Sequence, residues 1–582
     1  MRYRYMLLLS LALTATLTLL PNAWANEPDP LEGLWKAYKR FDPYHQGPLL
    51  INFTDQSATL SGQRAAVTVE GNRWRVEFPA QFGAFSGRWD GSTPRGHWQQ
   101  PVTVQTGMPN ASPLEFQALS NGLWSAELTP MPSQFTFYLP IEQTEEGALS
   151  TFLRNPERNL GVFARLVRID RDGNNLSFIG QAWGSDEQQV VATGQYYPDF
   201  ERFTLAISSW RGGTYDFIRE PDPANSAFNA RPDEPWVYRA PPDIQDGWAT
   251  GTLADAGIDE AVIRRMIEGP ISAPATDVHG IALHGLLIAR GGKLVLEEYF
   301  NGYHRDLPHD TRSAGKSLGS VLVGAAMHRG VDISPDTSVY AALEQPLDGL
   351  DERKRAMTLE HLLTMASGYY CDDGDGDAPG NEDTLQSQQA QPNWYQYILD
   401  LPMAMDPGEQ AIYCSANSNL IGAVISAQAD APLKDLVQDW IAAPLQIDQY
   451  HLNLQPTGEL YLGGGSHWLA RDYMKLAQMM LNGGTWNGQR IVSEQWARDS
   501  VAASVTIDDS PYGWQWWVAE YDWHGEPVTG FFAAGNGGQI FMGIPEADLV
   551  IATWGGNYSD SIGRQAQNVL IPDFILPATA RR

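Results

Sequence analysis

The stretch Ser313-Ala314-Gly315-Lys316 stands directly before an apolar run, SLGSVLVGAAMH, over residues 317–328. The composition of this run predicts a helix that begins close to Ser313. Residues three apart on a helix share one face, with Cβ atoms roughly 5–6 Å apart. The spacing therefore allows the Lys316 amine to reach the Ser313 oxygen.

A serine hydroxyl becomes a nucleophile when a base takes its proton, and Lys316 is placed to act as that base. Asp310 or Thr311 can cap the helix, which leaves Ser313 in the first turn, where free amide N–H groups favour negative charge. The apolar helix would assist the lysine by partly desolvating it. Lys316 is the only lysine in the chain that follows a serine by three residues. Taken alone, the pair is equally typical of a helix start with a surface lysine.

Two further segments carry groups that can assist a nucleophile. Tyr413 and Ser415 stand two residues apart before an apolar helix, an arrangement that can place a phenol and a hydrogen-bonding partner beside Ser313. Gly535 and Asn536 precede an apolar strand, where a backbone amide can join that of Ser313 in an oxyanion hole. Each segment by itself is explained equally well by packing or by a glycine-rich hairpin.

Together, the three segments resemble the serine β-lactamase and penicillin-binding-protein superfamily, whose elements are S-x-x-K, Y-x-N or Y-x-S, and K-T-G or H-x-G in that order. The closer resemblance is to the esterase and amidase branch related to class C β-lactamases, which includes 6-aminohexanoate-dimer hydrolases. It covers residues 247–582. The supporting phrases are LLIARGGKLVLEEYFNGY (286–303), TLEHLLTMASGYY (358–370), DPGEQAIYCSANSNLIGAVI (406–425) and GGGSHWLARDYMKLAQMMLNGG (463–484).

The resemblance implies a role for each residue of the catalytic trio. Ser313 would be the acylated nucleophile and Lys316 the base that activates it. Tyr413 would carry a proton to the leaving group and help to activate the water that deacylates the enzyme. The implied substrate is a small molecule or a peptide-like compound, and no cofactor is expected.

The resemblance also implies auxiliary positions, two of which depart from the family pattern. Ser415 stands where β-lactamases commonly have Asn, and Gly535 with the amide of Asn536 falls at the oxyanion edge. The third motif reads Ala533-Ala534-Gly535 and offers no Lys or His to bind a β-lactam carboxylate. We therefore expect ester or amide hydrolysis. A β-lactamase or D-amino-acid peptidase, or a catalytically silent envelope binding or sensor protein, are the alternatives.

The chain is expected to be multidomain. The resemblance implies that residues 247–582 form an α/β β-lactamase/transpeptidase-like domain, with an antiparallel sheet flanked by helices and a helical insertion. Residues 26–242 alternate apolar and polar side chains between turn signals, as in AAVTVEGNRWRVEF (65–78), which predicts an all-β accessory domain, a barrel or a sandwich. A stretch rich in proline and aspartate, 221–246, is expected to be the linker.

The two cysteines and the acidic segment between them each allow two structural interpretations. Cys371 and Cys414 allow one intramolecular disulfide in an oxidising compartment, or two buried thiols. Once the resemblance is granted, a bridge between them would brace the loop that carries Tyr413 (the tyrosine loop).

Asp373, Asp375 and Asp377 alternate in a way that suggests calcium. The segment lacks the glycine and the final glutamate of a calcium-hand loop, which favours a solvated acidic loop.

The net charge of the chain limits its binding partners, and its first 25 residues indicate its cellular compartment. The 69 acidic and 39 basic side chains give a formal charge of −30, which argues against nucleic acids and anionic membrane surfaces as partners. Arg2 and Arg4 precede an apolar run and the pattern Ala23-Trp24-Ala25, so residues 1–25 are expected to be a cleavable signal peptide. The run of about 15 residues is too short to span a bilayer, and no cysteine follows the cleavage site. We therefore expect a periplasmic or secreted protein without a stable membrane anchor.

Overall fold

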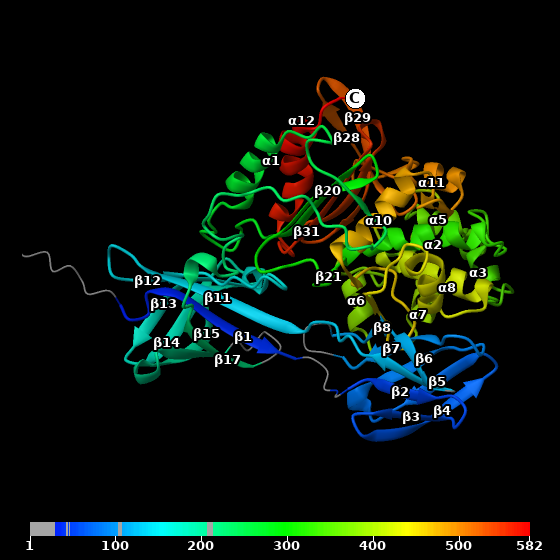
Figure 1. The fold of residues 1–582 in the computed structure, drawn as a ribbon, viewed down its shortest axis with the longest axis horizontal. Helices are drawn as coiled ribbons and strands as arrows, with labels where there is room; N and C mark the ends of the chain where they lie inside the picture. Colours follow the sequence, from blue (N-terminus) through cyan, green and yellow to red (C-terminus); the bar gives the residue numbers. More distant parts are fainter. Residues whose placement is uncertain are drawn as a thin grey trace, which may run out of the picture.

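The computed structural model describes residues 29–41, 45, 47–102, 107–120, 122–206 and 213–581. The expected signal peptide, residues 1–25, lies outside these ranges. The described chain forms a β-barrel, a large curled β-sheet and an α/β unit. Figure 1 shows the barrel and the curled sheet lying side by side beneath the α/β unit.

The N-terminal barrel closes on itself through the pairing of its first and last strands, in which Trp35 lies opposite Arg219. Its interior is filled by rings such as Trp35, Phe203 and Phe217, whose centroids lie 4.9–5.0 Å apart in successive pairs. The strands are β1 (Gly33–Arg40), β11 (Gln134–Gln143), β12 (Leu149–Thr151), β13 (Ala164–Asp172), β14 (Asn175–Ala182), β15 (Gln188–Tyr197), β16 (Arg202–Ala206) and β17 (Thr214–Arg219). The all-β expectation and its barrel form are thus confirmed.

A second β unit is inserted in the sequence between β1 and β11, with a core of its own around Trp74 and Trp98. Its strands are β2 (Leu49–Asn52), β3 (Ser57–Leu60), β4 (Gln63–Glu70), β5 (Arg73–Glu77), β6 (Ala84–Arg88), β7 (Arg95–Gln100), β8 (Asn110–Pro113), β9 (Glu115–Ser120) and β10 (Leu123–Glu127). The region expected to be one β domain therefore contains two β units with separate cores.

The curled sheet continues into the C-terminal half of the chain. Strand β8 pairs antiparallel with β22 (Tyr450–Asn453), so that Ala111 lies opposite Leu452. Strand β22 pairs in turn with β23 (His467–Trp468), and β23 with β21 (His309–Asp310), just before Ser313. One twelve-stranded sheet thus connects the second β unit with the segment that leads to Ser313.

Polar contacts reinforce this junction. The His97 Nε2 atom lies 3.1 Å from the Tyr450 hydroxyl, and the Ser112 hydroxyl lies 2.6 Å from His451 Nδ1. Arg95 of β7 forms a 3.0 Å ion pair with Asp439. Because most of these groups are buried, the sheet and the α/β unit are packed as one structure at this face.

The α/β unit is built around a nine-stranded, mostly antiparallel sheet. Its strands in spatial order are β18 (Ala249–Thr250), β20 (Lys293–Tyr299), β19 (Leu283–Arg290), β31 (Leu549–Gly555), β30 (Gln539–Ile544), β29 (Glu526–Gly535), β28 (Trp517–Trp523), β27 (Ser510–Tyr512) and β26 (Val505–Ile507). Every residue of β19, β30 and β31 is buried, because helices cover both faces of the sheet. This explains why these strands have continuous apolar runs rather than alternation.

The helices fall into two layers and a helical insertion, as expected. Helices α2 (Lys316–His328) and α10 (Ala470–Leu481) pack on one face, together with α11 (Glu494–Val501). On the other face lie α1 (Glu260–Met266), the π-helical segment η10 (Ala566–Ile575) and α12 (Leu576–Ala578). The insertion holds α3 (Val339–Ala342), α4 (Glu352–Ala356), α5 (Leu359–Leu363), α6 (Glu382–Ser387), α7 (Trp394–Asp400), α8 (Ser415–Ala429) and α9 (Leu433–Val437).

The expected linker lies against the α/β unit. Trp236 is 4% exposed within the core of that unit, and its backbone N–H donates to Glu268 at 2.7 Å. The Tyr238 hydroxyl donates to the Val295 carbonyl at 2.8 Å. These contacts hold this segment against the α/β unit. Among the residues described, none of the helices is both long and apolar enough to cross a membrane.

Candidate active site

The candidate nucleophile lies at a tight turn that leads into α2. Residues Arg312–Gly315 form the single 3₁₀ turn η6, and α2 begins at Lys316. The Asp310 carboxylate accepts the Arg312 backbone N–H at 2.8 Å, whereas Thr311 makes no side-chain cap. Asp310 is thus the capping residue of the two that the sequence offered.

Lys316 lies directly against Ser313. Its Nζ donates to Ser313 Oγ at 2.9 Å and to the Gly463 carbonyl at 2.7 Å. Lys316 is 2% exposed, whereas Ser313 is half-buried and so remains accessible. Sequence reasoning missed Gly463, because a backbone carbonyl leaves no signal of its own; the three glycines at 463–465 are the only trace of the close approach.

Tyr413 completes the group at the end of the loop before α8. Its ring centroid lies 4.9 Å from Lys316 Nζ, and the ring stacks on Trp517 at 5.6 Å. Burial raises the pKa of Tyr413, while the Lys316 charge and the Ser313 hydroxyl act in the opposite direction. The structure therefore brings Ser313, Lys316 and Tyr413 together, with the phenol neutral near pH 7.

Negative groups around Lys316 decide its protonation. Burial lowers the pKa of Lys316, but the electrostatic interactions with Tyr413, Glu382 and Asp373 raise it, and the net direction is upward. Burial raises the pKa of Asp373 to about 6, against the opposing charge of Lys316. The resting lysine is consequently an ammonium that polarises the serine oxygen.

The tyrosine loop is braced by a disulfide and by one carboxylate. Cys371 and Cys414 form a disulfide, with 5.7 Å between their Cα atoms. Asp373 accepts the backbone N–H of Ser415 at 2.9 Å and its hydroxyl at 2.6 Å, which caps the first turn of α8. Ser415 is thus engaged with Asp373, and both contacts hold Tyr413 in its place beside Lys316.

The acidic segment forms hydrogen-bonded turns. Besides the contact with Ser415, Asp373 accepts the Glu382 N–H at 3.1 Å, and the Asp375 carboxylate accepts the Asp377 N–H at 3.0 Å. Within the described residues, no three or more His, Cys, Asp or Glu side chains gather in a way that could hold a metal ion. The role of Asp373 as a cap beside the site was missed, because the sequence favoured a solvated acidic loop, with a calcium site as the alternative.

Gly535 lies against the turn that carries Ser313. A Cβ atom added at this glycine would lie 2.3 Å from the Thr311 carbonyl oxygen and 3.0 Å from the Ala314 nitrogen. Only glycine therefore allows the end of β29 to lie so close to η6. The next residue, Asn536, is exposed, and its side chain accepts the Ser559 N–H at 2.8 Å. This edge of the sheet is where a second oxyanion donor was expected.

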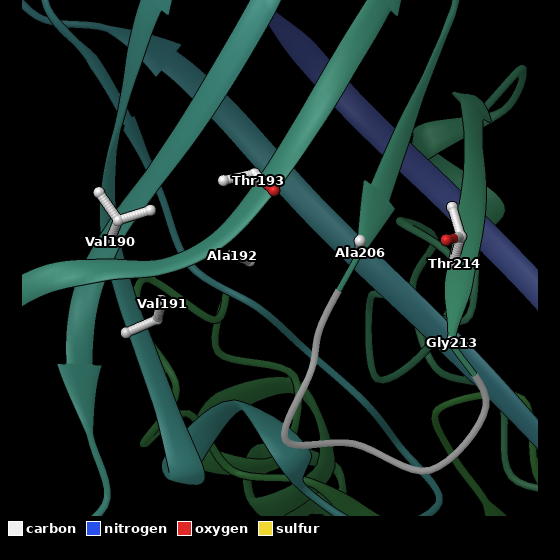
Figure 2. Close-up of a pocket in the computed structure, with 7 residues that line it drawn as sticks. All are labelled: Val190, Val191, Ala192, Thr193, Ala206, Gly213 and Thr214. Atoms are coloured by element: carbon white, nitrogen blue, oxygen red, sulfur yellow. The ribbon is translucent and has the colours of Figure 1, made fainter.

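A separate hollow of about 330 Å³ lies on the barrel and is lined by none of the residues of the Ser313 group. Figure 2 shows its lining, which comes from β15, β16, the start of β17 and the residue just before β17: Val190, Val191, Ala192, Thr193, Ala206, Gly213 and Thr214. None of these residues is an acid, a base or a cysteine. The hollow therefore does not compete with the Ser313 group as a catalytic site.

Comparison with known proteins agrees with this geometry. The chain matches the family described as Beta-lactamase over residues 262–555, about half its length. A relative named 6-aminohexanoate-dimer hydrolase, from Paenarthrobacter ureafaciens, is 24% identical over 289 residues, which cover 46% of this chain and 70% of the relative. The family match, over residues 262–555, includes the regions of all three sequence motifs.

Two solved structures extend the comparison. One is titled a putative 6-aminohexanoate-dimer hydrolase from Bacillus anthracis (TM-score 0.43, 17% identity, 58% of this chain and 87% of that one). The other is titled a putative beta-lactamase from Bacteroides dorei (TM-score 0.40, 18% identity, 51% of this chain and 88% of that one). The family match shows that this chain belongs to the beta-lactamase family and is a serine hydrolase.

Proposed function

We propose that the protein is an exported serine hydrolase that cleaves an ester or amide bond through an acyl-enzyme on Ser313. The observation that carries the proposal is the 2.9 Å hydrogen bond between Lys316 Nζ and a half-buried Ser313 Oγ, with Tyr413 beside the same ammonium. Packing alone does not require a serine hydroxyl in contact with a buried lysine amine. It is suited to nucleophilic catalysis.

In the proposed reaction, the Lys316–Tyr413 pair first releases one proton to solvent, and it then takes the proton of Ser313 as Oγ attacks the carbonyl carbon. The Ser313 amide and the amide at the Gly535–Asn536 edge would stabilise the oxyanion. The pair then returns the proton to the leaving alcohol or amine as the acyl-enzyme forms. A water activated by the same pair releases the acid and restores the serine.

The charge of the site supports neutral substrates over anionic ones. The motif Ala533-Ala534-Gly535 brings no cation to the oxyanion edge, and Asp373 and Glu382 place negative charge near Lys316. A β-lactam carboxylate would meet no dedicated partner there. One relative is named a 6-aminohexanoate-dimer hydrolase, which supports including that dimer among the substrates tested.

Two observations support export. The N-terminal pattern is that of a signal peptide, and the Cys371–Cys414 disulfide is of the kind that persists in an oxidising compartment. N-terminal sequencing of the protein recovered from a secreting host tests this step. A mature protein that begins at Asn26 is the expected result, and an uncleaved Met1 would contradict it.

The activity is tested with a fluorophosphonate probe and mapping of the labelled peptide by mass spectrometry. We expect one adduct, on Ser313, that is absent in Ser313→Ala and strongly reduced in Lys316→Ala. Initial rates on short p-nitrophenyl esters should exceed those on nitrocefin and on D-amino-acid amides. A folded protein without an adduct would refute the proposal, and full activity in Lys316→Ala would refute the mechanism.

A further inference from the structure

The residue just before the nucleophile has a strained backbone. Arg312 has φ +47°, a left-handed conformation that residues other than glycine rarely adopt. This conformation turns the chain sharply from β21 into η6 and so aims Ser313 at Lys316. Strain of this kind persists only where the surroundings hold it. The contacts that hold Arg312 are therefore part of the support of the nucleophile.

The Asp310 carboxylate is the principal restraint. One of its oxygens accepts the Arg312 backbone N–H at 2.8 Å, and the other lies 3.2 Å from Arg312 Nε. The Asp310 side chain is 6% exposed, and burial would raise its pKa; the charges of Arg312 and Arg158 outweigh this effect and lower the pKa well below its ordinary value. Asp310 thus depends on cations to remain a charged acceptor at this buried position.

One of these cations comes from the N-terminal barrel. Arg158 lies in the loop between β12 and β13, and its Nη1 donates to Asp310 Oδ2 at 2.6 Å. Its side chain is only 13% exposed, so the pair is shielded from solvent and from salt. By contrast, the Arg312 side chain is 36% exposed. Its guanidinium carbon also lies 4.8 Å from the centroid of the Tyr558 ring, a cation–π contact.

The barrel loop presents Arg158 in a fixed position. The Arg158 backbone N–H donates to the Asn155 side chain at 3.1 Å, and Asn159 donates to the Tyr558 carbonyl at 2.9 Å. Arg154, at the start of the same loop, donates to Asn301 of the α/β unit at 2.8 Å. The loop is therefore attached to the α/β unit on both sides of Arg158.

We propose that Arg158 of the N-terminal barrel is a positioning residue for the nucleophile, acting through Asp310 and the strained Arg312 backbone on Ser313. This assignment rests on the proposed function, and it makes the barrel a part of the catalytic support. Without Arg158, Asp310 would be left buried with a half-exposed cation as its only charged partner. The carboxylate would then take up a proton or turn toward solvent, and the Arg312 N–H would lose its acceptor.

The test compares Arg158→Met with Arg158→Lys and with a control, Arg168→Met. Arg168 lies on the same barrel and pairs with Asp170 at the surface, at 2.9 Å. Misplacement of a reacting group by about 1 Å can lower a rate 100-fold. We expect Arg158→Met to lower kcat and the fluorophosphonate labelling rate about 10- to 100-fold, with KM changed by less than about 3-fold. Arg158→Lys should recover part of the rate, and Arg168→Met should match the wild type.

A double variant separates positioning from simple attachment of the barrel. Asp310→Asn keeps an oxygen for the Arg312 N–H but needs no cation, so Arg158→Met/Asp310→Asn should label Ser313 faster than Arg158→Met alone. If Arg158 only attaches the barrel, the second change would bring no recovery. Wild-type rates in Arg158→Met, or no recovery in the double variant, would overturn the assignment.

Amide hydrogen exchange keeps this test distinct from that of the proposed function. Exchange in a peptide that contains Arg312 and Ser313 should be faster in Arg158→Met than in the wild type and the Arg168→Met control. A wild-type protein that no probe labels would refute the proposed function, while this exchange would still decide whether Arg158 holds the turn. Unchanged exchange would overturn the positioning role even in an active enzyme.

Discussion

The contact between Gly535 and the turn η6, which carries Ser313, yields a sharp prediction for Gly535→Ala. The added Cβ would lie 2.3 Å from the Thr311 carbonyl oxygen, and such contacts below 3.0 Å essentially do not occur. The strand β29 and the turn η6 must therefore separate by at least about 0.7 Å, and neither partner is a flexible side chain. Because a misplacement of about 1 Å can cost on the order of 100-fold in rate, we expect kcat to fall by about 30- to 100-fold.

The assay is hydrolysis of a p-nitrophenyl ester together with the labelling rate of Ser313 by a fluorophosphonate. The matched control is Gly319→Ala on helix α2, where the nearest atom to the new Cβ is Leu462 Cδ1 at 3.5 Å, an ordinary contact. Alanine there should leave the rate unchanged and favour the helix by up to about 1 kcal/mol. A Gly535→Ala enzyme with the wild-type rate would refute the close approach on which the oxyanion edge depends.

Three further predictions concern stability and pH. Replacing Cys371 and Cys414 together by serine should lower the free energy of unfolding by about 4 kcal/mol, because the bridge closes a loop with a sequence separation of 43; denaturant titration that shows no loss would contradict the bracing role. Burial raises the pKa of Glu157 from 4.5 to about 7, so that the unfolded state loses its proton first and stability falls by up to about 3 kcal/mol as the pH rises from about 4.5 to 8. Glu157→Gln should remove that loss, and unfolding curves of equal pH dependence in both proteins would show the assignment to be wrong. Ser415→Ala removes the 2.6 Å hydrogen bond to Asp373 and should lower stability by about 1.5–3 kcal/mol with only a several-fold change in rate; a 100-fold loss of rate at unchanged stability would instead give Ser415 a part in the chemistry.

Much of the α/β unit could be predicted because its signals are local. The helix predicted from the apolar run 317–328 is α2, which begins at Lys316 and ends at His328. The Ser313–Lys316 spacing predicts their contact because helical geometry alone fixes it. The two cysteines allow only one intramolecular disulfide, and the structure forms it in place of the two buried thiols that were the alternative.

The remaining features depend on pairings that no local pattern encodes. Alternation of side chains predicts strands in the N-terminal half but does not say which strand pairs with which, so the division into a barrel and a curled sheet could not be predicted. The contact of Arg158 with Asp310 spans 152 positions, and an isolated arginine in a loop gives no indication of its partner. The Gly463 carbonyl beside Lys316 is a backbone group and has no residue type to reveal it.

The pairing of β8 with β22 has a consequence for how the protein is made. Synthesis proceeds from the N-terminus at about 5–20 residues per second, so β8 waits on the order of tens of seconds before residues 450–453 emerge to pair with it. During that interval, the first half of the chain presents an open strand edge of the kind that aggregates. Cutting the gene at the linker would make that edge permanent in one fragment and expose β22 in the other. Each half of this protein thus depends on the other to complete its sheet.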